Sequence, residues 1–237
     1  MIRLPLGLVL ASATTTAAIA QQPEPTPTAP SQSRAGEIRI GFVAQSLRRQ
    51  SAFDAGGTAT GVGSLSGFEL FARLEGVGLL ARRSTGTIDA NGHGLEGEYL
   101  LREVRLIIGP RVFSIEGGRL QRTGSYLNVE AAPTAWRGGI RSQWSIGGSG
   151  VVVTIGAGAL FSKLDTEGGA QFKLRGHDLD AQALLQAPGH LPLYVLAGWR
   201  YERFDDLEAS SARSEEASGP YLGIGVRLAP RAILRDP

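Results

Sequence analysis

The sequence predicts an all-β fold, an antiparallel up-and-down barrel of about ten strands, with eight strands as the alternative count. Glycine occupies 33 of the 237 positions, about 14% against an average near 7%, and each glycine destabilises a helix interior by roughly 1 kcal/mol relative to alanine. Segments of about ten residues alternate apolar and polar side chains with a period of two, which is typical of strands. Long and short connections alternate between these segments, as they do in an up-and-down barrel.

The N-terminus precedes the first alternating segment and has a different composition. Met1–Arg3 is positively charged, Leu4–Ala13 is apolar, and Ala18-Ile19-Ala20 is a small-x-small cleavage motif, an order that predicts a secretory signal peptide. An uncleaved membrane anchor is the alternative, but this apolar stretch is too short and too rich in threonine to span about 30 Å. The chain is thus expected to consist of a signal peptide (1–20), a disordered Pro-rich spacer (21–35), the barrel (36–229) and a C-terminal tail (230–237).

Ten segments carry the alternation. In chain order they are 36–48, 66–75, 78–88, 98–109, 112–123, 134–146, 150–163, 177–186, 191–204 and 219–229. The connections between these segments run 17, 2, 9, 2, 10, 3, 13, 4 and 14 residues. Two positions depart from the pattern. Arg102 falls among the apolar positions of its segment, and the alternation changes phase near Gly176, which predicts a bulge or a loop there.

Three features favour a transmembrane barrel whose apolar face contacts lipid. The segments match the 9–11 residues that a tilted strand needs to cross a bilayer. Glycines share the polar face, where they would leave room for charged side chains in a narrow interior. Aromatic residues gather near segment ends and predict the girdles of such barrels: Phe68, Trp136, Trp144, Phe161, Trp199 and Tyr201. A secreted, soluble, lipocalin-like barrel that binds a small apolar ligand remains the alternative, with the two faces inverted.

The polar face predicts a charged lumen. Its proposed members are Arg39, Glu69, Arg73, Glu103, Arg105, Glu116, Arg137, Arg141, Asp180, Arg200, Glu202 and Arg227. The two signs nearly balance, and charges removed from water need partners because desolvation costs several kcal/mol per ion. An ion-pair network that plugs the barrel is therefore expected, and a narrow polar channel is the alternative.

Composition and motifs argue against several classes of function. The net charge is only +2 and basic residues alternate with acidic ones, so no nucleic-acid partner is expected. With no cysteine, the chain has no disulfide, thiolate nucleophile or cysteinyl metal site. His177 beside Asp178 resembles the rim His–Asp pair of omptin-type proteases, but adjacency alone does not make a general base. We expect no enzyme activity, no cofactor and no metal site.

Together these features resemble bacterial outer-membrane β-barrel proteins of the small OmpA/OmpX-like type. Leu222, Ile224, Val226 and Leu228 resemble the terminal strand signal that the barrel-assembly machinery reads, although that family usually ends in an aromatic residue. The resemblance implies a porin-like cell-envelope protein of a Gram-negative outer membrane, with a structural or surface-interaction role. Outer-membrane lipid and the assembly machinery are its implied partners, and a surface ligand is left unidentified.

Overall fold

The computed structural model describes the barrel and not the segments that flank it. The described residues are 36–52, 58–90, 97–126, 129–131, 134–147, 149–165, 171–187, 191–206 and 214–228. They belong to the second of two compact units, Met1–Ser33 and Arg34–Pro237. The predicted signal peptide, spacer and C-terminal tail therefore lie outside the described residues. Within the described part of the chain, there is no helix long and apolar enough to cross a membrane.

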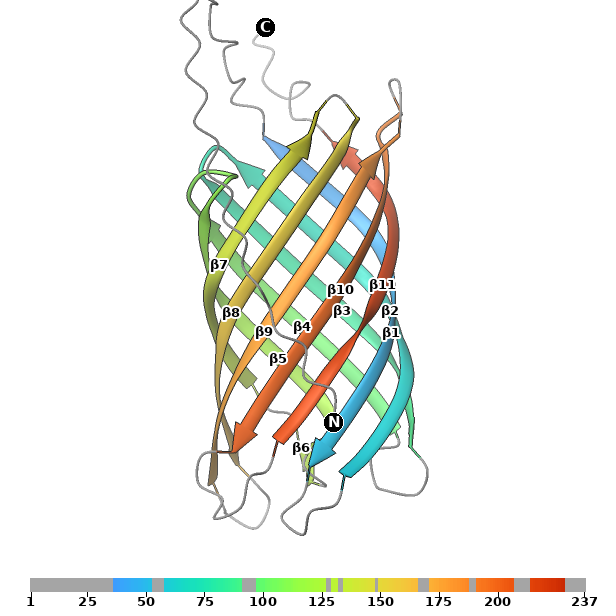
Figure 1. The fold of residues 1–237 in the computed structure, drawn as a ribbon, viewed down its shortest axis with the longest axis vertical. Helices are drawn as coiled ribbons and strands as arrows, with labels where there is room; N and C mark the ends of the chain where they lie inside the picture. The colour runs from blue at the N-terminus through green and yellow to red at the C-terminus, as the bar shows by residue number, and fades with distance from the viewer. Residues whose placement is uncertain are drawn as a thin grey trace, which may run out of the picture. The chain divides into compact units, whose positions relative to one another are not determined.

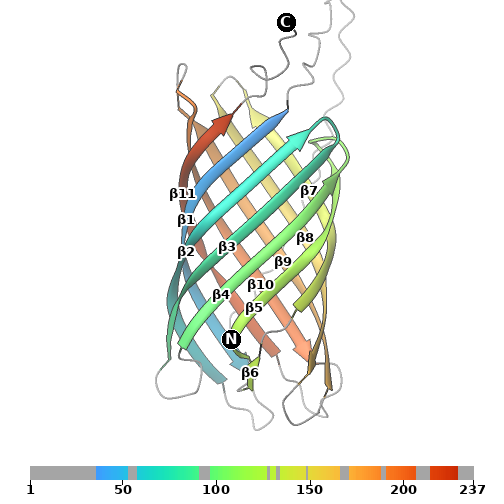
Figure 2. The same cartoon turned by 180° about the vertical axis from the view of Figure 1, so that it is seen from behind.

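Ten long antiparallel strands close into a barrel, as Figures 1 and 2 show. The elements are β1 (Glu37–Ala52), β2 (Thr58–Leu74), β3 (Val77–Ala90), β4 (Gly97–Ile108), β5 (Ser114–Tyr126), β6 (Val129–Ala131), β7 (Thr134–Ile146), β8 (Val151–Asp165), β9 (Gln171–Gln186), β10 (Leu193–Asp206) and β11 (Ser214–Leu228). Each barrel strand pairs with its neighbour in sequence, and β1 pairs with β11 to close the ring. The three-residue β6 pairs with the end of β5 outside this ring. The prediction of an all-β barrel of about ten strands is confirmed.

The register fixes the slope of the strands. Starting at Glu37 on β1, the paired residues lead once around the barrel and return to β1 at Arg49, 12 residues further along. With strands about 4.8 Å apart and about 3.3 Å per residue, this offset tilts the strands by about 40° and gives a backbone radius of about 10 Å. Each residue then climbs about 2.5 Å along the barrel axis.

The two ends of the barrel differ in the connections that they carry. Connections 75–76, 109–113, 147–150 and 187–192 lie at the end where β1 begins and β11 ends, which we call the turn end. The other end, the loop end, carries 53–57, 91–96, 127–133, 166–170 and 207–213. The sequence predicted that the connections at one end are much longer than those at the other. This prediction is wrong, because the strands extend much further toward the loop end than the alternation indicated.

The outer wall is apolar over the half of the barrel nearest the turn end. Ile40, Ile140, Ile155 and Ile224 are among its exposed side chains, and Ile224 is 57% exposed. Along β7 the outward-facing Trp136 and Trp144 are eight residues apart, which corresponds to about 20 Å of height at this tilt. That height approaches the roughly 25 Å apolar band of outer-membrane barrels. The soluble alternative is wrong, because it requires the apolar face to be inside.

Beyond this band the two faces exchange character. On β1, Ser46, Arg48 and Gln50 face outward while Leu47 is buried in the interior. On β9 the same exchange occurs near Gly176, which pairs without interruption with β8 and β10. The bulge or loop predicted there is therefore wrong. Beyond the lipid, the apolar residues of the alternating pattern face inward and the polar residues face outward. The backbone itself continues as a regular strand.

Candidate functional site

The inward face of the strands places the predicted lumen residues in one interior. Arg39, Glu69, Arg73, Glu103, Arg105, Glu116, Arg137, Arg141, Asp180, Arg200 and Glu202 are buried, and Arg227 is half-buried at the turn end. We use the name lumen charge network for the following buried residues: Glu69, Arg82, Glu103, Arg105, Glu116, Arg137, Arg141, Asp178, Asp180, Arg200 and Glu202. Its members come from strands all around the barrel.

Arg105 on β4 lies at the centre of the lumen charge network. Its guanidinium contacts Glu103 on its own strand, Glu116 on β5 at 3.4 Å and Asp178 on β9 at 3.3 Å. Arg137 on β7 joins the same two carboxylates, with 2.6 Å from Nη1 to Glu116 Oε1 and 2.6 Å from Nε to Asp178 Oδ2. Shared partners of opposite sign compensate the cost of burying so many charges.

Other pairs of the lumen charge network cross the full width of the barrel. Arg200 on β10 donates from Nη1 to Glu103 Oε2 on β4 at 2.9 Å, and these two strands stand five places apart in a ring of ten. Arg82 on β3 contacts Glu69 at 2.5 Å and lies 3.7 Å from Asp180 on β9. The network therefore connects opposite sides of the barrel across the lumen.

A second charged group lies at the turn end. Glu37 lies 3.2 Å from Arg39, 3.2 Å from Arg227 and 3.4 Å from the more exposed Arg111. Arg73 donates a hydrogen bond to the carbonyl of Gly109 in the nearby turn. Two clusters of buried side chains pack beside these charges, and Tyr221 of the first cluster donates a hydrogen bond to Asp180 Oδ1 at 2.6 Å. The two clusters comprise Val43, Leu184, Tyr194, Leu196 and Tyr221, and Phe71, Leu80 and Ile107.

Toward the loop end the interior contains a layer of apolar side chains beside the buried ion pairs of Arg122 with Glu202 and of Arg49 with Glu215. The members of this apolar layer are Leu47, Leu65, Ile88, Tyr99, Leu101, Leu120, Ala135, Leu160, Leu174, Phe204 and Ala217. An interior cavity of about 10 Å³ lies where the layer meets Arg122, Arg200 and Glu202, which is room for about one water molecule. Both apolar and charged side chains therefore face the lumen.

Several interior residues were not predicted, because they lie in segments assigned to long connections. Arg49 on β1 contacts Glu215 on β11 at 2.6 Å, and both side chains are buried. Leu65, Leu174 and Ala217 of the apolar layer lie in such connections, whereas its other members lie in predicted strands whose interior was expected to be polar. The signal of this layer in the sequence is the continued period of two through Leu47, Arg49 and Ser51, with the apolar residue now inside.

Glycine makes room for the lumen charge network. A Cβ atom at Gly158 on β8 would lie 2.7 Å from Arg137 Cζ and 2.7 Å from Asp178 Oδ1. At Gly198 on β10 a Cβ atom would meet the Tyr221 ring and the carbonyl oxygen of Ala181, the latter at 2.6 Å. Part of the glycine excess therefore lies on the inner face of the strands, where an arginine or tyrosine side chain from another strand packs directly against the backbone.

The predicted girdle residues lie on the outer wall. Phe68, Trp136, Trp144, Phe161 and Trp199 are exposed, and Tyr201 is half-buried beside His177, with 5.7 Å between ring centroids. His177 faces outward on β9, whereas Asp178 is buried in the lumen. The rim His–Asp pair considered from the sequence is therefore not formed. Among the described residues, there is also no group of three or more His, Cys, Asp or Glu side chains that could hold a metal ion.

Comparison with solved structures finds bacterial surface barrels. Neisserial surface protein A (NspA) shares 14% identity over 79% of this chain and 96% of that chain, with a TM-score of 0.35. The beta domain of the Bordetella autotransporter BrkA shares 12% identity over 79% and 98%, with a TM-score of 0.37. OprG from Pseudomonas aeruginosa, an outer membrane protein, shares 12% identity over 82% and 95%, with a TM-score of 0.32. No family model and no curated protein matches the chain.

The architecture itself identifies the class of protein. The strands close without an exposed edge, the wall is apolar over about the thickness of a membrane, and the interior is charged. A barrel of this kind satisfies every backbone hydrogen bond within the wall, which the hydrocarbon of a bilayer requires. The chain is a membrane-spanning β-barrel protein.

Proposed function

We propose that this protein is a non-conducting outer-membrane barrel with a structural or surface-interaction role and no enzyme activity. The observation that carries the proposal is the contact of 2.9 Å between Arg200 and Glu103, which joins opposite walls through the middle of the lumen. Arg105 and Arg137 add further contacts in the same section. A lumen about 10 Å in backbone radius is narrow enough for such side chains to fill it.

The apolar layer supports the same role independently. An ion that passed the lumen charge network would next meet Leu65, Leu101, Leu120 and Leu160, which are nearly inaccessible to solvent. The charged residues at this level are paired, Arg122 with Glu202 and Arg49 with Glu215. Moving an unpaired ion into apolar surroundings costs many kcal/mol. A polar channel would need both barriers to open together.

Planar-bilayer recording of the purified protein tests the proposal. We expect no steady single-channel current from the wild type. A variant that removes both barriers, Arg105→Ala with Arg200→Ala and Leu101→Ser with Leu160→Ser, serves as the positive control and should conduct if it folds. Steady currents from pure wild-type protein would replace the proposal with the narrow polar channel.

We also infer that β11 carries the signal for assembly. Leu222, Ile224, Val226 and Leu228 all face outward, and β11 pairs with β1 to close the barrel. Replacing Leu222, Ile224 and Val226 with serine should lower the amount of heat-modifiable folded barrel in cells. The matched control replaces the outward-facing Ala181, Ala183 and Leu185 of β9, and equal loss in the two variants would contradict a specific signal.

A further inference from the structure

Three arginines stand together on the outer wall of the barrel. Arg83 on β3 and Arg102 on β4 are direct partners in the register. Arg119 on β5 pairs with Val104, two residues from Arg102 on β4, so that Arg102 and Arg119 are diagonal neighbours about 7–8 Å apart. All three are exposed. Arg102 is also the residue that interrupts the apolar positions of its segment.

These arginines lie at the level where the apolar band ends. Arg119 pairs directly with Trp136 of the girdle, and Arg83 pairs with Phe68. A registered step from one strand to the next rises by about 3 Å at this tilt. Arg83, Arg102 and Arg119 therefore lie within about 3 Å of one height, which is the height of lipid headgroups rather than of acyl chains.

The positive charge of this cluster is not neutralised by the described part of the protein. Arg119 donates a weak hydrogen bond to Thr134 Oγ1 at 3.4 Å, and among the described residues no carboxylate lies within ion-pair distance of Arg83, Arg102 or Arg119. Like charges directly opposite each other on neighbouring strands are destabilising. An anion that bridges Arg83 and Arg102 would turn this repulsion into attraction.

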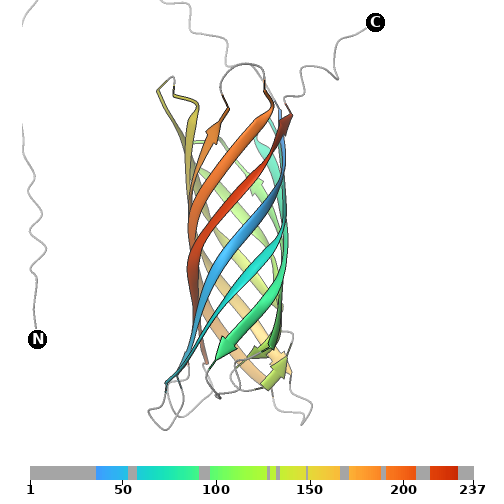
Figure 3. The same ribbon diagram turned by 90° about the vertical axis from the view of Figure 1, so that its right-hand side faces the viewer.

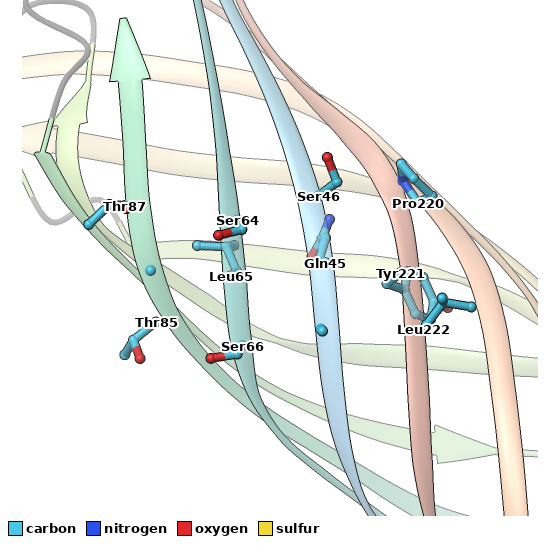
Figure 4. Close-up of a pocket in the computed structure, with 12 residues that line it drawn as sticks. Gln45, Ser46, Ser64, Leu65, Ser66, Thr85, Thr87, Pro220, Tyr221 and Leu222 are labelled. Carbon is cyan, nitrogen blue, oxygen red and sulfur yellow. The ribbon is translucent and has the colours of Figure 1, made fainter.

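A hollow of about 510 Å³ adjoins the cluster on the outer wall. Hydroxyl side chains from three strands line it, as Figure 4 shows: Ser46 on β1, Ser64 and Ser66 on β2, and Thr85 and Thr87 on β3. Thr85 and Arg83 are two residues apart and therefore share one face of β3. Ala44, Leu65, Pro220 and Leu222 also line the hollow. Its hydroxyl groups can donate hydrogen bonds to a sugar and accept them from it, and its apolar side chains can pack against the sugar ring.

We propose that this surface, formed by Arg83, Arg102 and Arg119 with the adjoining hollow, binds the phosphorylated sugar headgroup of a glycolipid in the leaflet nearest the loop end. Guanidinium groups bind phosphate through paired, charge-assisted hydrogen bonds. A phosphate would lie between Arg83 and Arg102, and the attached sugar would contact the hydroxyls of the hollow. The height of the cluster commits the ligand to a lipid, because its acyl chains would continue down the apolar band. The proposal rests on the outer-membrane barrel and not on closure of the lumen.

Binding of lipid A to the full-length protein in detergent, measured by native mass spectrometry, tests the proposal. The probes are lipid A with its phosphates and the same lipid after enzymatic removal of the phosphates. The variant Arg83→Gln/Arg102→Gln is compared with Arg48→Gln/Arg175→Gln, which removes equal charge from exposed arginines elsewhere on the outer wall. We expect about tenfold weaker binding of phosphorylated lipid A in the first variant alone. The dephosphorylated lipid should bind the wild type and the first variant equally.

Several outcomes would overturn the proposal. Equal loss of binding in the two variants would indicate attraction by general charge, and undiminished binding in Arg83→Gln/Arg102→Gln would exclude the cluster. Displacement of the lipid by millimolar inorganic phosphate would show that the cluster takes free phosphate. Heat-modifiable gel mobility verifies that each variant is folded. The single variant Arg102→Gln provides a second measurement, with several-fold weaker binding expected, and binding equal to that of the wild type would count against the proposal.

Discussion

Arg200 on β10 and Glu103 on β4 form an ion pair across the full diameter of the barrel, with 2.9 Å between Nη1 and Oε2. The strands that carry them are as far apart in the ring as two strands can be. The walls of this barrel are therefore connected by side chains as well as by the sheet. Stability should depend on interior charges even though lipid surrounds the protein.

Arg105→Met should destabilise the barrel by about 3–5 kcal/mol, because it leaves Glu103, Glu116 and Asp178 with less positive charge in a buried site. Unfolding by urea in phosphatidylcholine vesicles measures the effect. Arg48→Met, on the exposed outer wall, is the matched control and should change the free energy of unfolding by less than about 0.5 kcal/mol. Equal values for the two variants would show that the network contributes nothing.

Gly158→Ala should destabilise the barrel by about 1–3 kcal/mol, because its Cβ atom would be forced against Arg137 and Asp178. Gly138→Ala is the control, since a Cβ atom at that outward-facing position meets nothing within 4 Å. The same vesicle assay compares the two variants. A harmless Gly158→Ala would mean that the lumen charge network has room to rearrange.

Ile224→Arg should cost roughly 2–4 kcal/mol, because Ile224 lies near the middle of the apolar outer face of β11 and a charge there would face hydrocarbon. Ser218→Arg on the same strand and face lies beyond the apolar band and should cost at most about 1 kcal/mol. Refolding titrations in vesicles give both values. If the order of the two costs were reversed, the membrane position derived from the girdle would be wrong.

His177→Ala should have no catalytic consequence, because His177 and Asp178 point to opposite faces of β9. We expect the folded wild type to leave a mixture of peptides intact, as judged by mass spectrometry. Cleavage by the wild type that disappears in His177→Ala would contradict the non-enzymatic proposal.

The half of the barrel inside the membrane could be predicted from the sequence in detail. There the outer wall contacts lipid, so that Phe42, Leu70 and Ile224 alternate with inward polar or small residues in the expected phase. Strand number, the apolar outer face and the placement of Arg105 or Arg200 inside all follow from that contrast. Which carboxylate each arginine contacts does not follow, because it depends on the register around the whole ring.

The half toward the loop end was misread, for a physical reason. Outside the lipid the outer wall contacts water, so that polar residues such as Arg48 face outward and Leu47 turns inward. The outward-facing positions in this half are not regularly apolar, so a pattern of apolar outward residues does not continue there. The sequence therefore predicted long connections in place of strands. The phase change near Gly176 marks the same boundary. If this phase change is interpreted as the edge of the membrane, the sequence predicts both the longer strands and the apolar layer.

The pairing of β1 with β11, seen side by side in Figure 3, constrains the order of assembly. Every other pair of adjacent barrel strands is joined by a short connection, whereas β1 and β11 are separated by residues 53–213. Until β1 and β11 have paired, each presents an unpaired edge that could pair with other chains. Closure of the barrel therefore depends on a contact between the first and last strands of the chain, which no local turn can hold in register.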